Sequence, residues 1–435
     1  MKFTIIIPFT HLYNRFMRAH IMKLNTAILH GPFSVDPVTG SPLPPIVQVS
    51  AFSQPSGEQM EKVFQGRAPG FAYTRLGNPT ISAFEQRIAA LEGGMSATAC
   101  ASGMAAVAMA LLNILRTGDE IIATSRLYGG TLNLFHDLEN LGIVTRFAKN
   151  GAAENVAPLV TEKTRLIFAE TISNPGLDVT DIPALAALAH AHDLPLIIDN
   201  TTATPVLVKP LKLGADIVIH SSSKYLNGSG SAISGVVVDG GRFVWNAERW
   251  PALTGYCAMP KMAFTARLRQ DLWQNFGPCL APQNAYLNIL GMETLGLRME
   301  RECQNAAALA QALRSLPGLR DVNHPSLETS PSHTLVQRDM AGGLGGALLT
   351  FRMGSRARAL ALIGKLKYAY IVSNIGDVRT LVVHPASSIF IHSSKEEKEC
   401  AGVYDDLIRV SVGIEDIEDL IEDFSQAVQA ISDIE

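Results

Sequence analysis

Chemically active side chains stand just after short apolar runs at several points of this sequence. Glu170 and Asn174 follow the apolar run Leu166–Ala169, and Asp199 follows Leu196–Ile198. Ser221, Ser223 and Lys224 follow the run Ile217–Ile219. The carboxyl ends of parallel strands meet at one edge of a sheet, which is where such folds bind ligands. If these runs are parallel strands, the residues that follow them line one site.

An acid, a lysine and an anion cradle on one sheet edge suit the cofactor pyridoxal phosphate. Lys224 would form its Schiff base, and Asp199 would keep its pyridine nitrogen protonated. The amides of Gly103 and Met104, at the start of the helix that Ser102 introduces, would bind its phosphate, because free N–H groups and the helix dipole favour an anion there. Each residue alone has a commoner role, such as a helix cap, so the hypothesis depends on the whole set.

Other ligand classes fit the sequence less well. A phosphate-binding loop of the GxxxxGK(S/T) type is absent, and Gly228–Ile233 carries isoleucine where a dinucleotide fingerprint needs its third glycine. His190 and His192 stand two residues apart on an expected helix, so their side chains point away from a common ligand. We therefore predict no dinucleotide and no bound metal.

The apolar runs and the helical patterns between them predict a large α/β domain over residues 76 to 270. Asn78-Pro79-Thr80 opens a helix with proline in its first turn, and Gly93 ends it. The runs show no polar alternation, which indicates strands buried on both faces. They are Glu120–Ala123, Leu166–Ala169, Leu196–Ile198, Ile217–Ile219 and Val236–Val238. The expected fold class is α/β, with a mostly parallel sheet flanked by helices.

Two further regions accompany this domain. Residues 22 to 75 are rich in Pro, Gly, Ser and Thr, which indicates an extended N-terminal arm that packs on another subunit. Residues 271 to 435 mix helical and strand patterns and predict a smaller α+β domain. Its expected elements are a long helix from Asn284 to Leu316, a strand at Ala347–Phe351, a helix from Arg356 to about Lys365, a strand at Leu381–Val383 and a final helix after Gly413. Residues 1 to 21 are expected to be a disordered extension, with Met22 as an alternative start.

Length, charge and cysteine usage bound the function class. The 435 residues suit two domains plus an arm, and a formal net charge of −4 without a basic stripe argues against nucleic acid as a partner. No apolar run approaches the length of a membrane span. The five cysteines are scattered and never form a C-x-x-C pair, which favours a reducing compartment. We expect a cytoplasmic protein.

Several segments resemble the Cys/Met-metabolism family of pyridoxal-phosphate-dependent enzymes, which has fold type I. The stretch from His220 to Gly228 looks like the cofactor-lysine motif of that family. The other similar segments are Tyr73-Thr74-Arg75, Asn78-Pro79-Thr80, Ala101–Ala105, Leu127–Thr131, Glu170-Thr171, Asn174-Pro175, Asp199–Thr201, Gly376-Asp377, His384–Ser387 and Ile408–Gly413. They occur in the family's order and cover essentially all of residues 24 to 433.

The resemblance implies a role for each residue of the site. Lys224 would hold the cofactor and move protons, Tyr128 would stack on its ring, and Asp199 would pair with the ring nitrogen. The implied cofactor-binding residues are Tyr73, Arg75, Ser102, Gly103, Met104, Tyr128, Asn174, Asp199, Thr201, Ser221, Ser223 and Lys224. Ser373, Asn374 and Arg409 would bind the substrate carboxylate. Tyr73 and Arg75 would reach the phosphate from a neighbouring subunit, within a homotetramer made of two dimers.

Within the family, the segments around Gly130, Ser373–Asp377 and Gly291–Arg301 are most similar to O-acetylhomoserine sulfhydrylases. This similarity implies γ-replacement on O-acetylhomoserine with sulfide or a thiol, giving homocysteine or methionine and acetate. The alternative is a γ-lyase acting on methionine or cystathionine, and a remote alternative is an inactive binding homologue. The sulfur donor stays open among sulfide, methanethiol and a carrier thiocarboxylate.

Three departures from the family pattern bear on substrate or nucleophile choice. Ser223 stands where threonine is usual, and Ser229 where sulfhydrylases and lyases usually have histidine. The third departure is Ser388-Ile389-Phe390, where the family generally has Thr-Thr-His. Cofactor chemistry is expected to survive all three.

Overall fold

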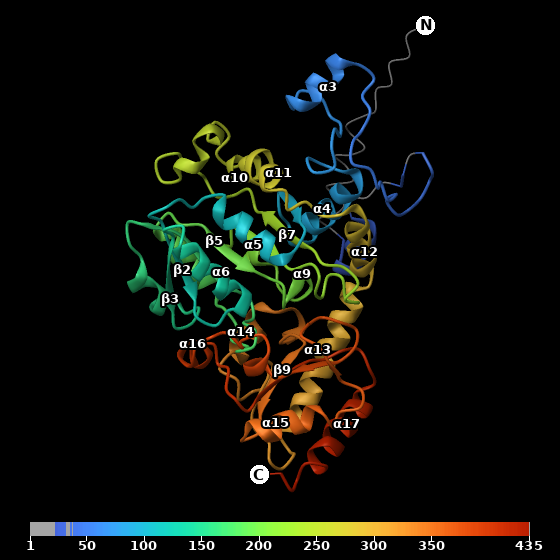
Figure 1. The fold of residues 1–435 in the computed structure, drawn as a ribbon, viewed down its shortest axis with the longest axis vertical. Coiled ribbons are helices and arrows are strands. Elements are labelled where there is room, and N and C mark those ends of the chain that lie inside the picture. Colours follow the sequence, from blue (N-terminus) through green and yellow to red (C-terminus); the bar gives the residue numbers. More distant parts are fainter. Residues whose placement is uncertain (1–21, 32–34, 37, 435) are drawn as a thin grey trace.

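The computed structural model describes residues 22–31, 35–36 and 38–434, which contain a seven-stranded and a five-stranded sheet (Figure 1). The larger sheet lies in the part of the chain coloured cyan to green, and the smaller one in the orange and red part (Figure 1). Residues 1 to 21, expected to be a disordered extension, lie outside the described residues. None of the described helices combines the length and apolarity needed to cross a membrane.

The seven-stranded sheet has the order β1-β7-β6-β5-β4-β2-β3. Its strands are β1 Ser96–Cys100, β2 Glu120–Thr124, β3 Val144–Ala148, β4 Thr164–Glu170, β5 Leu196–Asp199, β6 Ile217–His220 and β7 Gly235–Asp239. Strands β3, β2, β4, β5 and β6 run parallel, whereas β7 pairs antiparallel with both β6 and β1. The predicted mostly parallel α/β sheet is confirmed.

All five strands that the sequence predicts for the large sheet occur. The sheet also has two strands, β1 and β3, that the sequence does not predict. β1 consists of Ser-Ala-Thr-Ala-Cys, whose small residues lack the β-branched apolar signal of a strand. β3 is an edge strand on which Val144 and Arg146 are exposed, so it shows no continuous apolar run. By contrast, every residue of β2 is buried.

Helices cover both faces of the large sheet, because neighbouring residues of each strand point to opposite sides. Leu196 and Ile198 belong to one apolar core and Ile197 to the other. The first core includes residues of α4 (Pro79–Glu92), α8 (Ile182–Ala191) and α12 (Pro282–Glu293), and the second includes residues of α5 (Gly103–Leu112), α6 (Gly129–Glu139) and α10 (Ala263–Arg267).

The predicted start and end of α4 are present. The side chain of Asn78 accepts a hydrogen bond of 2.9 Å from the N–H of Thr80, Pro79 occupies the first turn, and Gly93 ends the helix with φ of 77°. The remaining helices of the large domain are short: α7 Ala153–Val156, α9 Thr204–Leu207 and α11 Gln274–Phe276. The arm is extended only in part, since it contains α2 (Leu24–His30) and α3 (Gly57–Phe64).

The five-stranded sheet has the order β10-β11-β12-β9-β8. Its strands are β8 Arg320–Asn323, β9 Leu348–Arg352, β10 Tyr370–Ile371, β11 Leu381–Val383 and β12 Leu407–Ser411. The associated helices are α13 Leu295–Leu313, α14 His333–Asp339, α15 Arg356–Ile363, α16 Lys395–Cys400 and α17 Ile417–Gln429. The smaller α+β domain is therefore present, and the boundaries at residues 75 and 270 stay predictions.

The prediction of a single long helix from Asn284 to Leu316 was wrong. The structure has α12 and α13 instead, separated at Thr294, whose φ of −105° and ψ of 5° leave the helical region. This break lets α12 pack against α4 of the large domain while α13 packs against α17 of the small one. The uninterrupted apolar periodicity of the sequence does not show the break, because both helices bury one face.

Candidate active site

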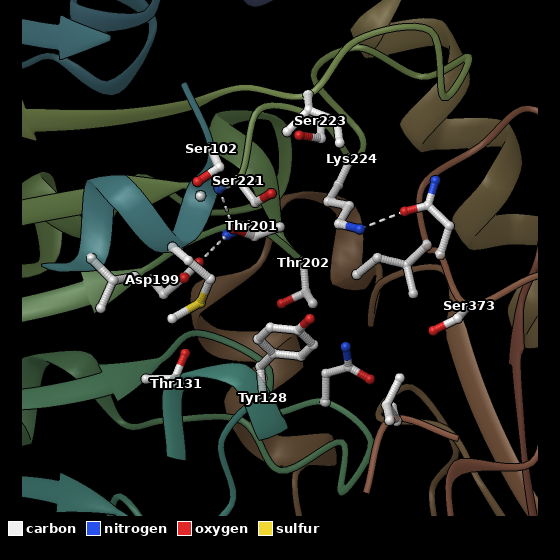
Figure 2. A pocket seen from close by; sticks show the side chains of 18 of the residues that line it. Ser102, Tyr128, Thr131, Asp199, Thr201, Thr202, Ser221, Ser223, Lys224 and Ser373 are labelled. Carbon is white, nitrogen blue, oxygen red and sulfur yellow. Dashed lines mark hydrogen bonds between the residues drawn. The ribbon is translucent and has the colours of Figure 1, made fainter. Parts of the chain in front are cut away.

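Lys224 follows β6 and lies where the two domains meet. Its Nζ donates a hydrogen bond of 2.5 Å to Oδ1 of Asn374, which belongs to the loop between β10 and β11 (Figure 2). Figure 2 shows the side chains of Lys224, Asp199, Tyr128 and Ser373 around one space. That space is a cavity of about 410 Å³, a size usual for small-molecule sites.

Burial lowers the pKa of Lys224 from 10.5 to about 8, and the nearby charge of Arg409 adds to the effect. A low-dielectric surrounding disfavours the ammonium form, and a second cation disfavours it further. About a tenth of the amine is therefore neutral at pH 7, against less than a thousandth for a lysine of ordinary pKa. The neutral amine is the form that attacks a carbonyl and the form that accepts a proton.

Asp199 ends β5 and is the register partner of Glu170, which ends β4. Burial raises the pKa of the Asp199 carboxyl, against the opposing hydrogen bonds of Thr201, whose N–H donates to Oδ1 at 2.9 Å. A buried carboxylate whose charge is disfavoured suits a cationic N–H partner, which restores the charged form. The chemistry of this site therefore fits a protonated pyridine nitrogen.

The start of α5 fits a phosphate. The Ser102 side chain caps the helix by accepting the N–H of Ala105 at 3.1 Å. The N–H groups of Gly103 and Met104, in the first turn, have no acceptor within the helix. A Cβ atom at Gly103 would lie 2.5 Å from the Cβ of Ser221, so only glycine lets the loop after β6 approach the helix this closely.

The hydroxyls of the loop after β6 are held by different partners. The Oγ1 of Thr201 accepts the N–H of Ser221 at 2.8 Å, which joins the loops after β5 and β6. The Ser223 hydroxyl donates to the carbonyl of Ser234 at 3.0 Å and accepts its N–H at 2.8 Å. Ser223 therefore uses its proton within the protein, and its expected contact with the phosphate stays a prediction.

Arg409 lies on β12 and is 3% exposed. Its guanidinium donates to Oδ1 of Asn174 at 3.0 Å and to the carbonyl of Asn374 at 2.9 Å, while its Nε has no hydrogen-bond partner among the described residues. Burial lowers the pKa of Arg409 to about 10, so it remains a cation at neutral pH. A buried cation with donors to spare, beside Ser373, suits a carboxylate ligand.

Glu170 lines the same cavity, as its place after an apolar run predicts, although no chemical task was predicted for it. Its Oε1 accepts the N–H of Tyr128 at 2.7 Å and its Oε2 accepts the N–H of Asn174 at 3.2 Å. Burial raises the pKa of Glu170 well above its ordinary value, and the charge of Asp199 raises it further. Glu170 thus fixes the backbone of two expected cofactor-binding residues. Its place at the end of β4, beside Asp199 on β5, is the signal that predicts it at this edge, whereas its hydrogen-bond partners become known only from the fold.

The structure brings thirteen of the fifteen expected site residues together around the cavity. They are Ser102, Gly103, Met104, Tyr128, Asn174, Asp199, Thr201, Ser221, Ser223, Lys224, Ser373, Asn374 and Arg409. The other two, Tyr73 and Arg75, do not line the cavity of their own chain. The Arg75 guanidinium donates to the carbonyl of Gln274 and lies 5.5 Å from the ring centre of Tyr73.

We predict that cofactor-free enzyme recombines with pyridoxal phosphate at a rate set by the neutral fraction of Lys224. With the pKa of this lysine near 8, the rate rises about tenfold per pH unit below 8 and levels off above it. Stopped-flow recording of the visible absorbance at a series of pH values measures the profile. Lys224→Ala must abolish the chromophore, whereas Lys163→Ala, at an exposed lysine, must not change it. A rate that keeps rising into the ordinary range of lysine would contradict the assignment.

Glu170→Gln is expected to weaken cofactor binding roughly tenfold, because an amide offers only one oxygen to two backbone N–H groups. Titration of cofactor-free enzyme with pyridoxal phosphate, followed by fluorescence, measures the dissociation constant. The matched control is Glu154→Gln, at an exposed glutamate on α7, which leaves the constant unchanged. An unchanged constant in Glu170→Gln would show that the two hydrogen bonds do not shape the site.

Comparisons with known proteins agree with this geometry. The family model described as Cys/Met metabolism PLP-dependent enzyme matches residues 25–429. O-Acetyl-L-homoserine sulfhydrylase of Leptospira meyeri is 38% identical, with 94% of this chain and 97% of that protein covered. L-Methionine gamma-lyase of Fusobacterium nucleatum subsp. polymorphum is 39% identical, with 89% and 93% covered.

A solved structure is also similar. It is that of a Campylobacter jejuni protein described as an O-acetylhomoserine (thiol)-lyase, which holds an N'-pyridoxyl-lysine-5'-monophosphate. Its TM-score to this chain is 0.90 at 33% identity, with 94% of this chain and all of that one covered. Sequence, fold and site lead to one conclusion: the chain belongs to the Cys/Met-metabolism family of pyridoxal-phosphate-dependent enzymes.

Proposed function

We propose that the chain catalyses γ-replacement on O-acetylhomoserine by sulfide or a thiol, releasing acetate and forming homocysteine or its thioether. The observation that carries the proposal is the placement of Lys224 between a carboxylate-binding group and a pyridine-binding acid. Its amine bonds Asn374, whose backbone carbonyl is held by Arg409, while Asp199 lines the same cavity. The sulfhydrylase relative from Leptospira meyeri supports the choice of substrate.

Each group then has a task on the substrate. Pyridoxal phosphate, when bound, withdraws electrons from the substrate's α-carbon and makes the protons on Cα and Cβ acidic. Arg409 holds the substrate carboxylate and so orients the single Cα–H bond toward Lys224. The Lys224 amine, with its lowered pKa, takes the proton from Cα and returns protons later. Removal of a Cβ proton then lets the γ-acetoxy group leave as acetate with the electron pair of the Cγ–O bond. The thiol sulfur bonds to Cγ as its own proton is lost, and Cβ and Cα regain their protons.

The glycine at position 130 favours γ-replacement over γ-elimination as the reaction. Some γ-lyases of the family carry cysteine at this position, which directly follows Tyr128-Gly129. A Cβ atom at Gly130 would lie 2.5 Å from Cε1 of the Tyr128 ring. A side chain at position 130 would therefore require the Tyr128 ring to move.

The quaternary structure we propose is a homotetramer of two dimers with shared sites, located in the cytoplasm. Tyr73 and Arg75 lie outside their own cavity, and the arm exposes Val49, Met60 and Phe64. Exposed apolar side chains on an arm favour burial against a second copy, which would carry Arg75 to that copy's phosphate. All five cysteines are free, which favours a reducing compartment.

We predict that purified holoenzyme with O-acetylhomoserine and sulfide releases acetate and forms homocysteine in equal amounts. With methionine alone, keto-acid release is expected to be much slower, because Gly130 stands where some γ-lyases of the family carry cysteine. Acetate and thiol assays measure the first reaction, and a coupled keto-acid assay measures the second. Lys224→Ala must lose both activities. Fast keto-acid release from methionine would favour the γ-lyase, and no turnover of either substrate by cofactor-loaded protein would favour the inactive homologue.

Co-expression of Arg75→Ala and Lys224→Ala chains is expected to restore activity that neither variant has alone. In a mixed dimer one of the two sites combines an intact Lys224 with the intact Arg75 of the other chain. About half of wild-type activity therefore returns in each mixed dimer, and about a quarter in a random mixture of the chains. Differently tagged chains purified over two columns supply the mixed species. Activity no higher than that of the separate variants would refute the shared site.

A further inference from the structure

Two of the free cysteines, Cys100 and Cys279, face each other across a short antiparallel bridge. Cys100 ends β1, and Cys279 lies between α11 and α12, far along the chain. The N–H of Ala101 donates to the carbonyl of Pro278 at 2.7 Å, so the hydrogen bonding lies beside the two cysteines and not between them. In such a non-hydrogen-bonded pair the Cα atoms are about 4.5 Å apart, and both side chains lie on the same face.

Both cysteine side chains belong to one apolar core. Cys100 is fully buried in the core that includes residues of α5, α6 and α10, and Cys279 packs against the same core while staying partly exposed. Burial, together with the nearby charges of Glu85 and Cys279, raises the pKa of the Cys100 thiol to about 12. The electrostatic effect of one cysteine on the other agrees with two thiols that lie close together.

This arrangement meets the geometric requirement of a disulfide bond. Cysteines joined by a disulfide have Cα atoms about 4.4–6.8 Å apart and Cβ atoms about 3.8 Å apart. The Cα spacing of a non-hydrogen-bonded pair, about 4.5 Å, is inside that range. The Cβ atoms of facing residues are about 4.5–5.5 Å apart, so an approach of about 1 Å is needed to close the bond.

The end of β1 leads directly into the segment that fits the cofactor phosphate. Cys100 stands two residues before Ser102, which caps α5. This segment has no room to move independently, because a Cβ atom at Gly235 would lie 2.1 Å from the carbonyl oxygen of Ser102, and one at Gly103 would lie 2.5 Å from the Cβ of Ser221. A displacement of Cys100 therefore reaches the N–H groups at the start of α5.

We propose that Cys100 and Cys279 form a reversible disulfide that weakens the binding of pyridoxal phosphate. The oxidant is a small-molecule disulfide such as oxidised glutathione. A disulfide whose formation displaces its surroundings is more easily reduced than an ordinary structural one, so the pair is expected to be a dithiol under reducing conditions and to close when the surroundings become oxidising.

The exchange needs no other reactant. The Cys279 thiol loses its proton to solvent, and its sulfur attacks one sulfur of oxidised glutathione, which breaks that S–S bond and expels one glutathione thiolate. The Cys100 sulfur then loses its proton and attacks the Cys279 sulfur, which expels the second glutathione thiolate. Both thiolates take up a proton. The two cysteines lose two electrons, and one oxidised glutathione becomes two reduced molecules.

The first test detects the bond itself. Holoenzyme is equilibrated with mixtures of oxidised and reduced glutathione, quenched with acid, alkylated and digested without reductant. Mass spectrometry is expected to show the Cys100 and Cys279 peptides joined, lighter than their sum by two hydrogen atoms. Cys100→Ala removes the sulfur that attacks second, so Cys279 keeps one glutathione in that variant. Cys400→Ser, at an exposed cysteine on α16, is the control and must leave the joined peptides unchanged.

The second test measures the effect on the cofactor. Oxidation is expected to raise the dissociation constant of pyridoxal phosphate about tenfold, the worth of one hydrogen bond to a charged group. Fluorescence titration of cofactor-free protein, fully reduced or fully oxidised, measures both constants. Because linkage is reciprocal, the cofactor must shift the glutathione equilibrium toward the dithiol by the same factor. Cys279→Ser, at a partly exposed position, must keep the constant of the reduced protein and lose its response to oxidation.

Each remaining outcome overturns a stated part of the proposal. Glutathione left on Cys279 of the wild type, without joined peptides, shows that the two sulfur atoms do not meet. The absence of any reaction at Cys279 overturns the disulfide as well. Joined peptides together with equal dissociation constants in the two redox states overturn the effect on the cofactor.

Discussion

Neighbouring parallel strands of the large sheet end at one edge, and the whole site depends on this constraint. Glu170 and Asp199 are register partners at the ends of β4 and β5, and Lys224 follows β6, the next strand. Because side chains alternate between the faces, a shift of one strand by one residue would turn its last side chain to the other face. The strand register therefore selects which acid and which hydroxyls reach the cavity.

A buried polar network fixes these strand ends to one another. Glu92 at the end of α4 shares a hydrogen bond of 2.7 Å with the His220 ring and accepts one of 2.9 Å from Asn200. Asn200 in turn accepts the hydroxyl of Thr171 at 2.8 Å. All four side chains are buried, so a broken bond would leave a polar group without water or partner. The network joins the ends of β4, β5 and β6 under the loops that carry the chemistry.

The small domain contributes a buried cation and a hydrogen-bonding amide to the cavity at the sheet edge. Arg409 brings a buried cation, and Asn374 accepts from Lys224 while its carbonyl accepts from Arg409. The same closure removes water from Lys224 and so lowers its pKa, which readies the amine for proton transfer. Ile389 lines the same cavity from the loop after β11. The interface between the two domains thus sets the protonation of the base.

The sequence by itself determined the five main strands, because buried apolar runs are a local signal, and it identified Lys224 and Asp199, because these follow the runs directly. It also identified Arg409 through the family resemblance. Only the tertiary structure decided that Glu170 holds two backbone amides, that the Ser223 hydroxyl bonds Ser234, and that the break at Thr294 splits one expected helix. Hydrogen bonds form only between groups that the folded chain brings within about 3 Å. Which loops come that close depends on packing between distant segments, and no local pattern of residues records it.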